Sequence, residues 1–223
     1  MKIALGQTNP TIGRFEANLG LLQDQIKKAE QAGCQLIIFP ELALCGYPPQ
    51  DLLERADFLR AHDQALEDLI DAVGEIGVIV GAVEQRPGPG KPLYNAALFI
   101  QQGRVVHRVY KQLLPTYDVF DESRYFAPGQ PSLPFSFQGE VLGLTVCEDI
   151  WQEGQYLCDP VAELLRGHTK PDLLINISAS PYHHGKLGER NRLFSRLCQR
   201  HNVPLLYVNQ VGGQDSLIFD GHS

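Results

Sequence analysis

A cysteine in the stretch GLTVCEDIW stands directly after an apolar run and directly before two acids. This thiol, Cys147, is followed by Glu148 and Asp149. The thiolate is the nucleophilic form of cysteine, and adjacent carboxylates oppose its formation by like-charge repulsion. A reactive Cys147 therefore needs a cation from elsewhere in the chain. Without one, it is a small buried hydrophobic residue, which is the commoner state of an isolated cysteine.

Two more polar residues follow apolar runs in the same way. Glu41 follows LIIFP, and Lys111 follows VVHRVY. Functional side chains of α/β folds gather beyond the carboxyl ends of strands, so we consider the three residues together. A lysine ammonium beside Cys147 would offset the adjacent acids, while Glu41 would take the thiol proton and later give it to a leaving amine. Lys111 and the backbone N–H of Glu148 would stabilise an oxyanion, so the set predicts acyl transfer.

The elements that would position these residues alternate between short apolar runs and long amphipathic ones. Buried strands are expected at 2–7 and 35–40, with a helix over 17–33 between them. This strand-helix-strand order favours parallel pairing of the two strands in a mixed α/β fold. No linker or internal repeat divides the chain, so one domain is expected. The other expected elements are strands at 78–85, 140–151, 172–180 and 203–210, a hairpin at 95–111, and helices at 52–77 and 188–202.

Composition and charge narrow the possible partners. The chain has 223 residues, of which 43% are hydrophobic and 20% are charged, as in ordinary globular proteins. Its formal net charge of -7 argues against nucleic acid or an anionic membrane as a partner. The apolar stretch in the opening MKIALGQTNP is too short for a signal peptide or a membrane span. We therefore expect a cytoplasmic protein with neither kind of partner.

The remaining cysteines and the paired histidines predict no metal site. The five cysteines are an odd number without a C-x-x-C pair, so free thiols are expected. Cys45 lies in the turn-rich CGYPP and is expected to be structural. His183 and His184 would point to opposite faces of an extended segment, and no third ligand stands at a suitable spacing.

Three segments together resemble the active-site motifs of the nitrilase, or carbon-nitrogen hydrolase, superfamily. They are FPELALCGYPPQDLL, YKQLLPTYDVFDESRYFAPG and LTVCEDIWQ, in matching order along essentially the whole chain. More narrowly, LPTYDVFDESRYF, CEDIW and INISASPYHHGK resemble the glutaminase domains of glutamine-dependent NAD synthetases. The resemblance implies a four-layer α-β-β-α sandwich with two mixed sheets, and association into a homo-oligomer.

The resemblance also implies roles for individual residues. Members of the superfamily use a glutamate, a lysine and a cysteine as a catalytic triad. By this match Glu41 is the general base, Lys111 is the catalytic lysine, and Cys147 is the nucleophile that forms a thioester with the glutamyl group. Glu122 matches a further glutamate that many members place near the lysine, although an ordinary surface acid would look the same in sequence.

Substrate contacts are expected from the same resemblance. Tyr117 and Ser180 resemble positions that hold the α-amino and α-carboxylate groups of glutamine, and Glu148 would help to bind the amine. Lys186 falls where relatives have a basic residue, but a lysine lacks the bidentate fork of an arginine. Two aromatic residues are expected to line the pocket, although core packing would explain them equally well: Tyr47 and Trp151.

The implied activity is hydrolysis of L-glutamine without a cofactor in this domain. A separate synthetase domain would use the ammonia, ATP and Mg²⁺ to amidate deamido-NAD. The stretch VGGQDS at 211–216 is similar to the phosphate loop of such domains, but Val211 replaces a serine and strand-like LIFD follows, so no nucleotide site is predicted. Residues 1–223 are expected to be a C-terminally incomplete glutaminase domain that lacks the last strands of the sandwich, with the synthetase domain outside this chain.

Two other functions remain compatible with the sequence. The chain could be a free-standing amidase or nitrilase-type hydrolase that acts on another small amide. It could also be a catalytically silent scaffold that only mediates assembly. Trapping a thioester with a panel of amides separates the first alternative from a glutaminase, and loss of function on replacing Lys111 and Cys147 excludes the second.

Overall fold

The first sheet of the computed structural model has five strands in the order β1-β2-β3-β4-β5. Strands β1, β2 and β3 are parallel, whereas β4 and β5 run antiparallel to their neighbours, so the sheet is mixed. The predicted hairpin is confirmed, and its turn residues Gln102 and Gly103 both have positive φ, as tight hairpin turns require. The strands are β1 (Ile3–Leu5), β2 (Leu36–Ile38), β3 (Gly77–Gln85), β4 (Leu93–Gln101) and β5 (Arg104–Tyr110).

The second sheet has four strands in the order β6-β7-β8-β9. Strand β6 is antiparallel to β7, while β7, β8 and β9 are parallel, so this sheet is mixed as well. Its strands are β6 (Phe135–Phe137), β7 (Glu140–Val146), β8 (Leu173–Ser178) and β9 (Leu205–Asn209). A separate antiparallel ribbon follows, formed by β10 (Val211–Gln214) and β11 (Leu217–Asp220).

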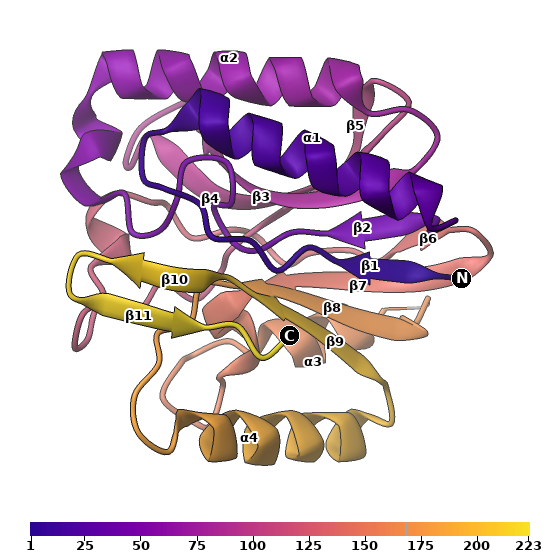
Figure 1. Ribbon diagram of the computed structural model, residues 1–223. Helices are drawn as coiled ribbons and strands as arrows, with labels where there is room; N and C mark the ends of the chain where they lie inside the picture. The colour runs from indigo at the N-terminus through magenta and orange to yellow at the C-terminus, as the bar shows by residue number, and fades with distance from the viewer. Residues whose placement is uncertain (168) are drawn as a thin grey trace.

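The structure describes residues 1–167 and 169–223, and these form four layers (Figure 1). Helices α1 (Phe15–Gln31) and α2 (Ala56–Ala72) pack on the outer face of the first sheet, and α3 (Pro160–Leu165) and α4 (Lys186–His201) pack on the outer face of the second. Between the sheets, Phe99, Leu144 and Ile177 belong to one buried apolar cluster. The predicted α-β-β-α sandwich is therefore confirmed.

The prediction of one helix over 52–77 is wrong. The structure has a 3₁₀ turn, η1 (Gln50–Glu54), then an extended Arg55 with φ -95° and ψ 119°, and only then α2. Leu53, just before the break, is buried in the cluster that contains Tyr47, and Leu69 of α2 is buried against the first sheet.

Within the described ranges, no helix combines the length and the apolar character that crossing a membrane requires.

Candidate active site

Three strand ends bring the predicted catalytic residues into the interior. Glu41 lies in the segment that follows β2, Lys111 directly follows β5, and Cys147 directly follows β7. They are 0%, 1% and 5% exposed, respectively. A buried charge is costly unless it is paired, so the contacts of Glu41 and Lys111 determine what the site can do.

A glycine allows the Glu41 segment to lie against the first sheet. The N–H of Gly81, in the middle of β3, donates to the carbonyl of Pro40 at 3.1 Å. A Cβ atom at this position would overlap the backbone of Glu41 and Leu42. Only glycine permits this close approach, so Gly81 helps to fix the position of the Glu41 backbone.

Lys111 lies between two buried carboxylates. Its Nζ is 2.7 Å from Glu41 Oε1 and 2.7 Å from Glu122 Oε1. The hydroxyl of Tyr47 donates to the same Glu122 oxygen at 2.9 Å. Charge-assisted hydrogen bonds of this kind fix the ammonium group at the junction of the two acids.

Glu41 receives donors from both sheets. Its Oε1 accepts from Asn95 Nδ2 in β4 at 2.7 Å and from Lys111, while its Oε2 accepts from the backbone N–H of Ala179, after β8, at 2.9 Å. A carboxylate has about four acceptor positions, so these three donors leave one position on Oε2 for a proton. The carboxylate is therefore both fixed and able to act as a base.

The backbone at Cys147 has a conformation that side chains rarely adopt. Its φ is +43° at the start of the 3₁₀ turn η3 (Cys147–Ile150), immediately after β7. Such left-handed conformations cost about 1–3 kcal/mol and are concentrated at functional sites. The amide group of Asn176 donates to the Cys147 carbonyl at 3.3 Å and so helps to hold the turn.

Burial and the neighbouring acids keep the thiol protonated at rest. Burial raises the pKa of Cys147 well above its usual value, Glu41 raises it further, and Lys111 lowers it only in part. Burial lowers the pKa of Lys111, but the carboxylates of Glu122 and Glu41 outweigh this effect and keep the lysine charged. Lys111 therefore offsets the acids less completely than expected, and attack by the thiol requires a base at the moment of reaction.

Glu148, also predicted to bind substrate, accepts hydrogen bonds from two tyrosines. Tyr117 and Tyr156 donate to its Oε1 at 2.8 and 2.6 Å. The Glu148 side chain is nearly buried, whereas Tyr117 is 51% exposed. The two tyrosines therefore hold the Glu148 carboxylate in a fixed position next to Cys147, and Tyr117 connects it to the protein surface.

The other predicted substrate residues lie around the start of α4. Lys186 Nζ is 4.0 Å from the centre of the Trp151 ring, a cation–π contact, and 3.4 Å from Glu189. Ser180 is buried, and its N–H donates to Asn209 Oδ1 at 2.8 Å. The guanidinium of Arg190 donates to the Ser180 carbonyl at 2.8 Å, so the loop before α4 is firmly held.

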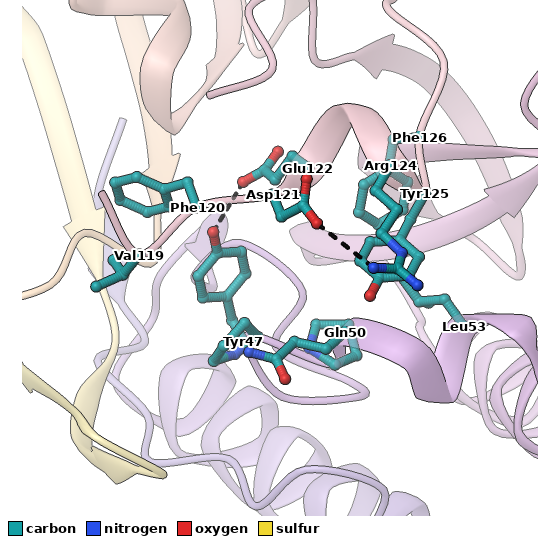
Figure 2. Close-up of a pocket in the computed structure, with 12 residues that line it drawn as sticks. Tyr47, Gln50, Leu53, Val119, Phe120, Asp121, Glu122, Arg124, Tyr125 and Phe126 are labelled. Atoms are coloured by element: carbon teal, nitrogen blue, oxygen red, sulfur yellow. Dashed lines mark hydrogen bonds and ion pairs between the residues drawn. The ribbon is translucent and has the colours of Figure 1, made fainter. Parts of the chain in front are cut away.

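A cavity of about 270 Å³ lies beside Glu122, the buried acid that pairs with Lys111, and η1 forms part of its wall (Figure 2). Figure 2 shows the Tyr47 hydroxyl directed at Glu122, with Phe120 and Val119 to one side. The other oxygen of Glu122, Oε2, is buried without a hydrogen-bond partner among the described residues. Burial raises the pKa of Glu122 to about 7, although Lys111 and Tyr47 lower it. The lining residues include neither Glu41 nor Cys147.

Several residues of the site were not predicted from the sequence, among them Asn95, Arg190 and Tyr156. Asn95 is a polar residue within the buried run of β4, and Arg190 lies on the same buried stripe of α4 as Leu193. A polar residue on an otherwise apolar face could have indicated in the sequence that each has a buried partner. Tyr156 lies in an irregular loop and carried no signal in the sequence.

The remaining candidates lie apart from these contacts. The Cys45 thiol is buried and donates to the carbonyl of Leu42, while His183 and His184 are exposed. The glycines of VGGQDS lie in β10, which turns into β11 rather than opening a helix, so this segment does not have the geometry of a phosphate loop. In the part of the chain that the structure describes, no group of three or more His, Cys, Asp or Glu residues is arranged to hold a metal ion.

The chain is similar to curated proteins over its whole length. The chain is 43% identical to the glutamine-dependent NAD(+) synthetase of Synechocystis sp. over 99% of its length and 40% identical to that of Thermotoga maritima over all of it. It spans only 41% and 38% of those relatives.

Solved structures show the same likeness. The glutamine-dependent NAD+ synthetase from Acinetobacter baumannii, in complex with ADP, has a TM-score of 0.89 and 37% identity, covering 98% of this chain and 40% of that one. An amidase from Nesterenkonia sp. has a TM-score of 0.82 and 25% identity, covering 99% of this chain and 80% of that one. Residues 2–223 match the carbon-nitrogen hydrolase family model. The chain belongs to the carbon-nitrogen hydrolase family.

Proposed function

We propose that this chain hydrolyses the side-chain amide of L-glutamine through a thioester on Cys147. The observation that carries the proposal is the buried array of Glu41, Lys111 and Glu122 beside a thiol held at φ +43°. A neutral thiol, a fixed carboxylate with a free acceptor position and a charged lysine are the groups that cysteine-dependent amide hydrolysis requires.

In the proposed first step, Cys147 Sγ attacks the amide carbon while Glu41 takes the thiol proton. The developing oxyanion is stabilised by Lys111 and by the backbone N–H of Glu148. Glu41 then gives its proton to the leaving nitrogen, the C–N bond breaks, and ammonia departs, leaving the acyl group on sulfur.

In the second step, Glu41 takes a proton from a water molecule that attacks the thioester. The C–S bond breaks, and the proton returns to the sulfur of Cys147. Glu122 does not exchange protons with the substrate in this scheme. It holds Lys111 between two carboxylates, and the resulting charge keeps the lysine protonated.

Glutamine suits the charges near the turn better than a simple amide does. Glu148, held by Tyr117 and Tyr156, would bind the α-ammonium group, while Lys186 over Trp151 and the buried Ser180 would bind the α-carboxylate. Tyr47 would act through Glu122 rather than on the substrate. A small amide without these two charged groups would leave both sites unused.

The named relatives support a wider role for the ammonia. Because the chain spans about two fifths of the glutamine-dependent NAD(+) synthetases that it resembles, residues 1–223 would form their glutaminase domain. A synthetase domain would then use the ammonia with ATP and Mg²⁺ to amidate deamido-NAD. Association into a homo-oligomer and a cytoplasmic location stay predictions.

Replacing the nucleophile tests this proposal. Cys147→Ala should abolish glutamine hydrolysis, measured as glutamate release, while a protein that also contains the synthetase domain still makes NAD from free ammonia. Cys45→Ala is the matched control, since that thiol lies four residues beyond Glu41 and donates only to backbone carbonyls. Equal loss of both activities in Cys147→Ala would show that this residue is structural.

The second candidate is an amidase that acts on another small amide, as the likeness to the Nesterenkonia amidase suggests. The panel of amides distinguishes the two functions. A kcat/KM higher for a simple aliphatic amide than for glutamine would reject the glutaminase.

A further inference from the structure

Asp149 is a buried acid that the proposed chemistry does not use. It lies in η3, two residues after Cys147, and is 1% exposed. Its Oδ1 accepts the backbone N–H groups of Gln112 and Leu113, both at 2.9 Å. Its Oδ2 accepts the backbone N–H of Val146 at 3.1 Å. Both oxygens are therefore bonded to backbone, and in different parts of the chain.

The three donors flank the two residues that must meet. Gln112 and Leu113 follow Lys111 at the end of β5, in the first sheet. Val146 precedes Cys147 at the end of β7, in the second sheet. A single carboxylate thus joins the segment that carries the lysine to the turn that carries the thiol.

We propose that Asp149 is a positioning residue that sets the Lys111 ammonium group relative to the Cys147 thiol. This inference rests on the proposed amide hydrolysis. Asp149 does not touch the reacting atoms and acts only through the backbone of the two segments. Its bond to Val146 also closes the turn in which Cys147 has its left-handed backbone conformation.

The chemistry of the donors explains why the residue is an acid. Only a carboxylate has acceptors on both oxygens, whereas an asparagine would turn an NH₂ group toward one of the N–H donors. Burial raises the pKa of Asp149 to about 6, although its backbone donors and Lys111 lower it, so the group is mainly ionised at neutral pH. The isosteric change Asp149→Asn therefore breaks the link at one oxygen and leaves the size of the side chain unchanged.

The expected result for Asp149→Asn is a loss of turnover without a loss of binding. Misplacing a catalytic group by an ångström costs about 100-fold in rate, so we expect kcat for glutamine to fall by about that factor while KM changes less than about threefold. Asp172→Asn is the matched control. That carboxylate also accepts a backbone N–H of β7, from Val141 at 2.8 Å, but at the opposite end of the strand, and its removal should leave kcat unchanged.

Alkylation of Cys147 by iodoacetamide, followed by mass spectrometry, gives a second measurement that needs no substrate. If wild-type protein is alkylated at Cys147 but does not hydrolyse glutamine, the proposed function fails while Asp149 is still tested. Slower alkylation in Asp149→Asn at an unchanged melting temperature supports the inference. Unchanged kcat and unchanged alkylation overturn it, as does a fall in both that matches the unfolded fraction seen by circular dichroism.

A second variant covers the case in which Asp149→Asn does not fold. Replacing Val146 by its α-hydroxy acid turns its N–H into an ester oxygen, so the donor to Oδ2 is lost while the Asp149 side chain and its bonds to Gln112 and Leu113 stay in place. A lower kcat at unchanged KM in this ester variant supports the positioning role. Wild-type kcat in the folded ester variant would overturn it.

Discussion

Glu122→Gln should change how the stability of this protein depends on pH. In the folded chain, burial raises the pKa of Glu122 from 4.5 to about 7, even though Lys111 and Tyr47 lower it. In the unfolded chain the carboxyl group returns to its ordinary value. Between these two pH values the folded state holds a proton at this site that the unfolded state has lost.

The sign and the size of the effect follow from this difference. A raised carboxyl pKa contributes stability that is fully present below pH 4.5 and is lost as pH rises through about 7. At roughly 1.4 kcal/mol per pKa unit, the contribution is about 3 kcal/mol. Glutamine cannot titrate, so the free energy of unfolding of the wild type minus that of Glu122→Gln should fall by about 3 kcal/mol from low to high pH.

Urea unfolding at a series of pH values from about 4.5 to 8.5 measures this difference, because subtraction removes the contributions of the groups that titrate independently of Glu122. Glu140→Gln is the control, since Glu140 is an exposed acid at the start of β7. Its difference from wild type should be flat. A flat curve for Glu122→Gln as well, or one that rises with pH, would refute the electrostatic argument.

Two further substitutions test the contacts of residues that were missed in the sequence. Tyr156→Phe removes the 2.6 Å hydrogen bond to Glu148, and because bonds to charged groups contribute about 1.5–3 kcal/mol, KM for glutamine should rise about 10-fold with little change in kcat. Steady-state kinetics measures this, and a fall in kcat at constant KM would contradict it. Arg190→Leu leaves Asp220 without its 2.6 Å partner and should lower the free energy of unfolding by about 3–5 kcal/mol in urea. Arg196→Leu, whose side chain is 72% exposed, should cost at most about 0.5 kcal/mol, and similar losses in the two variants would contradict the argument.

Much of the architecture was predictable because the spacing of apolar residues indicates whether an individual segment forms a strand or a helix. The strand before Glu41, the hairpin before Lys111 and the strand before Cys147 each have a short apolar run with a polar residue at its end, and the structure has a strand or hairpin at each of these places. The short strand β6 and the helix α3 were not predicted, because elements of three and six residues are too short to establish a period. The expected strand over 140–151 ends at Val146, where the 3₁₀ turn at Cys147 begins, and the hydrogen bond from the Val146 N–H to Asp149 across this turn has no signal in the hydrophobic pattern.

The contacts within the site were harder to predict, because they join segments far apart in sequence. The hydrogen bond between Tyr156 and Glu148 depends on the path of an irregular loop, for which the sequence contains no periodic signal. The ion pair between Arg190 and Asp220 joins α4 to β11, and it could be identified only from the folded positions of these two elements. The roles of Glu41, Lys111 and Cys147 came from residue type and family resemblance, and they stay predictions until the variants are assayed.

The two-sided support of Glu41 has a consequence for how this protein tolerates mutation. Its carboxylate receives Asn95 and Lys111 from one sheet and Ala179 from the other, so its bonds depend on the thickness of the apolar layer between the sheets. Packed sheets lie about 10 Å apart, and protein interiors yield little to compression. A change of side-chain volume at Phe99 or Leu144, remote from the thiol, would alter the spacing between the base and its donors before it unfolded the domain. Selection on activity would then constrain the interior of the sandwich more strictly than selection on stability.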